Sequence, residues 1–422
     1  MTSSGETVNV PALQRRLGLR DATLIGLGSM LGAGVFAAYT PAAQAAGSGL
    51  LVGLLVAAVV AFCNAAASAQ LAAEYPTSGG TYVFGRVRLG PWWGFVAGWS
   101  FVVGKTASCA AMALTFGAYI APAGWDRPIA VAAVVVLGVV NYRGITRTAR
   151  VSGFIVVAVI LVLGTVVASG LSTGFPAAPE VASGLLSGGV YGILQSAGLL
   201  FFAFAGYARI ATLGEEVRNP TSTIPRAILL ALGICLVLYA AVATVALLTL
   251  GPEQVADAEA PLADVTAAAG WTWALPVVRI GGALASLGAL LALIAGIGRT
   301  ALAMAREGDL PRWLSAIHPR FSTPHRAELV LVVVVVGIVL FADVRGAIGF
   351  SSFGVLLYYL VANLSAFTQS RRLYSRGMQV VGIAGCTVLA FTLPLVAVAT
   401  GIAVVLLGCL YRVVRLRLGT SR

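Results

Sequence analysis

The stretch Gly28-Ser29-Met30-Leu31-Gly32-Ala33-Gly34-Val35-Phe36 interrupts the first long apolar segment of this chain. Three glycines within seven positions disfavour a continuous helix. Inside a bilayer, every backbone amide and carbonyl needs a hydrogen-bonding partner. The cluster therefore predicts an unwound turn whose backbone groups face something other than lipid. Close helix packing through Gly28 and Gly32 is the alternative. A nucleotide-binding loop is disfavoured because no strand precedes the glycines.

The whole chain has the composition of a membrane protein. Of its 422 residues, 59% are hydrophobic and 10% are charged, which excludes an ordinary soluble domain. About twelve apolar segments approach the roughly 20 residues that a membrane-spanning helix needs. They lie near residues 21–45, 48–72, 92–121, 128–142, 151–171, 190–213, 226–250, 275–298, 327–343, 347–369, 379–394 and 396–412.

The net charge of +12 indicates membrane topology and no nucleic-acid partner. If the N-terminus lies in the cytoplasm, most of the 27 basic residues fall in cytoplasmic loops or tails. This positive-inside pattern predicts a multi-pass protein of the cell membrane with both termini in the cytoplasm. We expect an N-terminal tail over 1–19, a membrane domain over 20–415 and a C-terminal tail over 413–422.

The middle of the predicted spans contains no histidine, aspartate or glutamate from which a catalytic site could be built. The five cysteines lie in apolar segments without the spacing of metal ligands, and both histidines fall in one predicted loop. Every acidic residue lies in a loop or near the end of a span. We therefore expect neither an enzyme nor a cofactor.

A second interruption is predicted in the sixth segment, at Phe201-Phe202-Ala203-Phe204-Ala205-Gly206-Tyr207. The first and sixth segments would each begin one half of a ten-helix unit. Interrupted helices at corresponding positions of two halves are typical of inverted-repeat transporters, whose substrates bind near the middle of the membrane.

Four motifs together resemble the amino acid–polyamine–organocation permeases, which are LeuT-like secondary transporters of amino acids. They are residues 28–36, residues 201–207 with 215–220, residues 76–82 with Gly98-Trp99, and residues 304–311. The resemblance implies an all-α membrane protein of about twelve spans, with a 5+5 inverted repeat and broken helices 1 and 6. Repeat one would cover about 20–172 and repeat two about 188–370, followed by helices over about 379–412.

The resemblance also implies a binding site for an amino acid at the two breaks. Amides near Gly32-Ala33-Gly34 would bind the substrate carboxylate, since the start of a helix attracts anions. Carbonyls near Gly28, Ser29, Ala203 and Phe204 would bind the ammonium, beside Gly206 of the second break. Phe202 would be an aromatic gate over the substrate, the alternative being a packing or lipid-facing ring. Candidates for an ionic gate on the cytoplasmic side are Glu215, Glu216 and Arg218.

Lys105 is the only lysine of the chain and lies in the middle of the third segment. An ionisable residue at such depth is costly and points to function. It is either a proton-responsive coupling residue, a fixed cation that favours acidic or neutral substrates, or a structural partner of freed carbonyls. Some proton-linked relatives carry a lysine in the fifth span, where this chain has the apolar stretch 154–160. Lys105 is thus the candidate for both substrate binding and coupling.

These patterns predict a secondary active transporter that moves an amino acid or a related amine by alternating access. Proton symport or substrate exchange is favoured over sodium symport, because no carboxylate lies at mid-membrane. A membrane sensor of amino acids and a passive channel are the alternatives.

Overall fold

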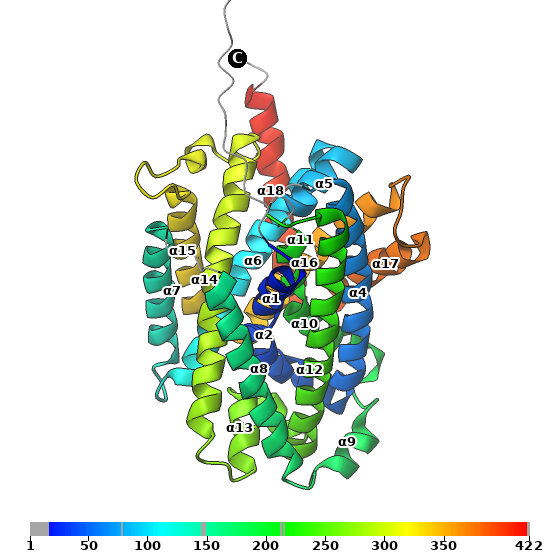
Figure 1. Ribbon diagram of the computed structural model, residues 1–422, viewed down its shortest axis with the longest axis vertical. Helices are drawn as coiled ribbons and strands as arrows, with labels where there is room; N and C mark the ends of the chain where they lie inside the picture. Colours follow the sequence, from blue (N-terminus) through cyan, green and yellow to red (C-terminus); the bar gives the residue numbers. More distant parts are fainter. Residues whose placement is uncertain (1–16, 77–78, 145–148, 212, 214–215, 420–422) are drawn as a thin grey trace, which may run out of the picture.

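Helices form almost all of the structure (Figure 1). The computed structural model describes residues 17–419 except 77–78, 145–148, 212 and 214–215. The helices of the first part are α1 (Leu19–Met30), α2 (Ala33–Ala37), α3 (Tyr39–Ala46), η1 (Gly47–Gly49), α4 (Leu50–Glu74), α5 (Gly80–Leu89), α6 (Pro91–Ile120), α7 (Asp126–Tyr142), α8 (Ala149–Leu171) and α9 (Ala178–Gly184). Those of the second part are α10 (Gly189–Phe204), η2 (Ala205–Tyr207), α11 (Ala208–Ala211), α12 (Pro220–Asp257), α13 (Pro261–Ala268), α14 (Leu275–Arg306), η3 (Arg312–Ser315), α15 (His325–Phe341), α16 (Val344–Phe367), α17 (Arg376–Thr392) and α18 (Leu395–Gly419).

The protein is an all-helical, multi-span membrane protein. Eight helical segments within the described residues are long and apolar enough to cross a bilayer. The shorter helices α7, α15 and α17 have 17 residues each. Each of the twelve predicted apolar segments coincides with one of these helices or with a series of consecutive ones.

Three helices extend clearly further than the apolar pattern predicts, and one of them, α18, reaches Gly419 although its predicted segment ends at residue 412. The eighth predicted segment ends at residue 298, whereas α14 continues to Arg306. Similarly, α12 continues to Asp257 beyond a kink at Gly251, whose φ is 79°. Charged residues end an apolar segment but do not end a helix, since helices can continue beyond the hydrocarbon layer. Part of each predicted loop is therefore helical.

Small residues allow the central helices to approach closely. A Cβ atom on Gly354 of α16 would lie 2.7 Å from the Ser100 carbonyl oxygen of α6. Such contacts between backbones are the usual basis of helix association in membranes. In Figure 1, α1, α2 and α10 lie at the centre of the bundle, with α5 and the end of α18 at one end and α9 and α13 at the other.

Candidate functional site

Both predicted interruptions are present in the structure. The first helix stops at Met30 and restarts at Ala33, with Leu31 and Gly32 between the two parts. The sixth segment changes from α10 into the 3₁₀ turn Ala205–Tyr207 before α11. The described fold thus places two helix interruptions at the centre of one bundle.

The two breaks touch each other through glycine. A Cβ atom on Gly34 would lie 2.6 Å from Ala203 Cα, and one on Gly206 would lie 2.3 Å from the Ser29 carbonyl oxygen. Neither distance is compatible with a larger residue. Gly32 also packs closely, since its Cβ would lie 2.6 Å from Ala289 Cβ. The glycines therefore serve both close packing and the breaks, which were alternative explanations at the level of sequence.

Side chains from other helices cap the carbonyls freed at the breaks. The Tyr239 hydroxyl lies 2.6 Å from the Met30 carbonyl oxygen and 3.0 Å from that of Ala203. A hydroxyl has one proton, so it donates to only one of these two carbonyls at a time. The Ala205 carbonyl accepts hydrogen bonds from Lys105 Nζ at 3.4 Å and from the Tyr359 hydroxyl at 3.3 Å.

A cavity of about 920 Å³ extends from the breaks toward the end of the bundle that holds α5. Most of the predicted binding residues line it, namely Gly28, Ser29, Gly32, Gly34, Lys105, Phe202, Ala203 and Gly206. The side chain of Ala33 lies outside the described residues. Phe204 is not among the described lining residues, because its ring packs on that of Tyr239 with centroids 5.1 Å apart.

Positive charge predominates in this cavity. Its described lining includes four cationic side chains and one carboxylate, which are Lys105, Arg209, Arg299, Arg306 and Glu216. Lys105 is only 7% exposed and belongs to the end of the cavity next to the breaks. Among the described residues, no carboxylate lies within the 4.0 Å ion-pair distance of its amine.

The predicted ionic gate lies partly outside the described residues. Glu215 belongs to the residues that are not described, Glu216 lines the cavity and Arg218 is exposed. The backbone N–H of Leu17 donates to the Glu216 carbonyl at 3.0 Å, and that of Arg218 donates to the Leu17 carbonyl at 2.9 Å. These bonds tie the start of α1 to the segment that follows α11. An ion pair among the predicted gate residues stays a prediction.

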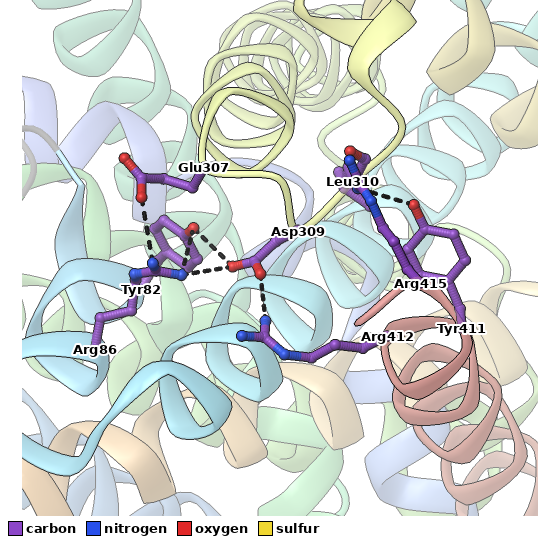
Figure 2. A network of polar contacts seen from close by, with 8 residues as sticks. All are labelled: Tyr82, Arg86, Glu307, Asp309, Leu310, Tyr411, Arg412 and Arg415. Atoms are coloured by element: carbon purple, nitrogen blue, oxygen red, sulfur yellow. Dashed lines mark hydrogen bonds and ion pairs between the residues drawn. The ribbon is translucent and has the colours of Figure 1, made fainter. Parts of the chain in front are cut away.

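Sequence analysis missed a buried ionic network at the same end of the bundle, which Figure 2 shows. The Asp309 carboxylate is 5% exposed and accepts hydrogen bonds from the Tyr82 hydroxyl at 2.8 Å, from Arg86 at 2.9 Å and from Arg412. Burial and the hydrogen bond to Asp309 raise the pKa of Tyr82, so its hydroxyl keeps its proton. We call this set the Asp309 network. It joins α5, the loop after α14 and α18.

Comparison with known proteins identifies the class. The fold and cavity are those of a multi-span membrane protein with a central site, and the amino acid permease family matches residues 17–409. The chain belongs to this family, within the amino acid–polyamine–organocation superfamily, and is a transporter rather than an enzyme.

Relatives differ in what their names say they carry. An uncharacterized transporter of Mycobacterium tuberculosis is 60% identical over 402 residues, which are 94% of this chain and 90% of that protein. A branched-chain amino acid permease of Bacillus subtilis is 29% identical, over 75% of this chain and 72% of the relative. Cationic amino acid transporter 6 of Arabidopsis thaliana, a chloroplastic protein, is 30% identical, over 87% and 68%.

Proposed function

We propose that this protein is a secondary active transporter that moves amino acids or related amines across the cell membrane by alternating access. The observation that carries the proposal is the cavity that links two touching helix breaks to one end of the bundle. None of the described residues of α3, α9 or α13 lines this cavity, so its lining reaches one end of the bundle only. A site that is reached from one side at a time is the requirement of alternating access.

A LeuT-like arrangement of two inverted five-helix repeats within twelve spans is part of the proposal. It is supported by the family match and by the breaks in the first and sixth segments. Such transporters bind their substrates between discontinuous helices near the bilayer midplane.

The breaks offer partners for both charged groups of an amino acid. Amides of Gly32, Ala33 and Gly34 would bind the carboxylate, because α2 continues through Ala38, which has helical angles, into α3. The ammonium would bind the carbonyls of Met30 and Ala203, since Tyr239 satisfies only one of them at a time. Phe202 would close over the bound substrate.

The open end of the cavity would face the cytoplasm, and both termini would lie on that side. This orientation is supported by the arginines at that end, including Arg86, Arg299, Arg306 and Arg412. The positive-inside pattern of the sequence gives the same orientation. The structure would then represent an inward-facing state, with Glu216 in the lining of the open cavity.

Proton coupling or exchange would drive transport, with Lys105 as the coupling residue. Its amine lies at the second break, where a change of charge acts directly on the Ala205 carbonyl. We expect Lys105→Met to remain folded and to lose the stimulation of uptake by an inward proton gradient. Unchanged stimulation in this variant would rule out Lys105 as the coupling residue.

The experiment that tests the function is uptake of radiolabelled amino acids into proteoliposomes, with and without an inward proton gradient and with and without internal substrate. Saturable uptake that a gradient or internal substrate stimulates supports the proposed carrier. Non-saturable flux would instead establish a channel. Binding without uptake or counterflow would establish a sensor, and the proposal would be wrong.

A further inference from the structure

We propose that Lys105 selects substrates by side-chain charge, and that the transported class is amino acids whose side chain ends in a carboxylate. The inference rests on the proposed function and specifies the substrate class of the same site. It concerns the end of the cavity where the two breaks meet.

Lys105 lines the cavity beside the breaks, where its amine contacts the Ala205 carbonyl, and Arg209 of α11 follows the second break by two residues. The neighbours of Lys105 in the lining include the apolar side chains of Phe101, Met112 and Phe202. Ser108 also lines the cavity, but its hydroxyl pairs with the Ser351 hydroxyl at 2.6 Å. A substrate side chain beside Lys105 therefore meets apolar surface and an ammonium group.

The amine of Lys105 has unused capacity to bind an anion. An ammonium group has three N–H donors. Within the described structure, one donor bonds to the Ala205 carbonyl at 3.4 Å, a long bond to an uncharged group. The same carbonyl also accepts the Tyr359 hydroxyl, so it does not depend on Lys105. A buried cation is stable when an anion compensates it, and here no carboxylate of the described chain does so.

A substrate with two carboxylates would match both ends of this site. Its α-carboxylate would bind the amides at Gly32 and Gly34, and its side-chain carboxylate would compensate Lys105. A lysine or arginine substrate would instead place a second cation beside the buried Lys105. The other charges of the lining favour the same substrates, because Arg209, Arg299 and Arg306 outnumber Glu216 and raise the local concentration of anions.

Parallel uptake measurements test the proposal on the full-length protein. Proteoliposomes are given radiolabelled glutamate, glutamine, leucine or arginine at equal concentration. Wild-type uptake is measured either with an inward proton gradient or with internal substrate, whichever gives the faster uptake. We expect the wild-type protein to take up glutamate about tenfold faster than glutamine, as one compensated charge implies. In Lys105→Met the glutamate-to-glutamine ratio, measured for both proteins by exchange without a proton gradient, falls to about one or below. Lys105→Arg keeps the preference.

Arg306→Met is the matched control, because it removes a cation from the mouth of the same cavity. Its glutamate-to-glutamine ratio changes by less than about twofold, since solvent screens an exposed charge.

Wild-type protein that takes up glutamine, leucine or arginine at least as fast as glutamate overturns the charge selection and leaves the transporter function intact. A ratio unchanged in Lys105→Met overturns it as well. If Lys105→Met does not fold, the proposal is tested by the glutamate-to-glutamine ratio of the wild-type protein and of Lys105→Arg. Failure to transport any amino acid or related amine overturns the proposed function itself.

Discussion

Gly206 shows how one residue holds the two breaks together. Alanine at this position would place its Cβ 2.3 Å from the Ser29 carbonyl oxygen, so one backbone must move. We expect Gly206→Ala to lower stability by about 1–3 kcal/mol, as overpacking does. Uptake should fall at least about tenfold, because a displacement of about 1 Å at a binding site is sufficient for such a loss.

Gly233→Ala is the control for this substitution, since a Cβ at Gly233 in α12 meets nothing within 4 Å. It should keep full uptake and melt at the same temperature or higher, because alanine favours the helix. Equal loss of uptake in both variants, measured at matched reconstitution, would contradict the role of the contact at Gly206.

Tyr239 is the residue through which α12 contacts both breaks. Tyr239→Phe leaves the Met30 and Ala203 carbonyls without their shared donor, at a cost of about 1–3 kcal/mol. We expect lower thermal stability together with weaker substrate affinity. Tyr119→Phe removes a buried hydroxyl that donates to the Phe36 carbonyl at 3.0 Å, and should lower stability alone. A Tyr239→Phe protein with unchanged affinity would show that the hydroxyl is purely structural.

At the scale of elements, local sequence properties explain what could be predicted. The glycine cluster indicated the first break, and the place of the sixth segment at the start of a second half indicated the other. The lengths of the apolar segments indicated where helices lie among the described residues. The ends of α12 and α14 could not be predicted, because charge ends the apolar pattern before the helix ends. Tyr239 was missed because nothing distinguishes it from other aromatic residues of apolar spans. Asp309 lies in a recognised motif, but its partner Arg412 is 103 residues away in the sequence.

The Asp309 network joins three elements, which gives it an effect on stability that a surface ion pair lacks. Asp309→Asn leaves Arg412, 7% exposed, without its carboxylate partner. Loss of one member of a buried ion pair costs about 3–5 kcal/mol. We therefore expect a clearly lower melting temperature for Asp309→Asn in detergent.

Glu307→Gln provides the comparison, because Glu307 pairs with the same Arg86 at 3.2 Å but is 55% exposed. An exposed pair is worth about 0–1 kcal/mol, so this variant should melt close to the wild-type temperature. Similar melting temperatures for both variants would mean that the Asp309 network does not hold α5, α14 and α18 together.

For the whole molecule, the structure combines rigid and separable parts in a way that suits alternating access. α6 and α16 touch backbone to backbone, and the Asp309 network ties α5 to α18. The residue before α1, Leu17, is bonded to the segment after α11 by two backbone hydrogen bonds. We therefore infer that the inner parts of the two broken helices move together against the rest, which closes the cavity from the cytoplasmic side.

Cysteine accessibility at Gly296 tests this movement. Gly296 lines the cavity on α14, and a Cβ there meets nothing within 4 Å, so Gly296→Cys adds a thiol without steric conflict. We expect a membrane-impermeant thiol reagent to label it from the cytoplasmic side of oriented vesicles, and more slowly once substrate is bound and the cavity closes.

Four of the five native cysteines are buried, and Cys409, which is partly exposed, is replaced by alanine to remove its background. The control is Gln254→Cys, an exposed position on α12 at the opposite end, which should react only from outside. Labelling of Gly296→Cys from outside and of Gln254→Cys from the cytoplasmic side would reverse the assigned topology. Substrate-independent labelling at Gly296→Cys would contradict closure of the cavity.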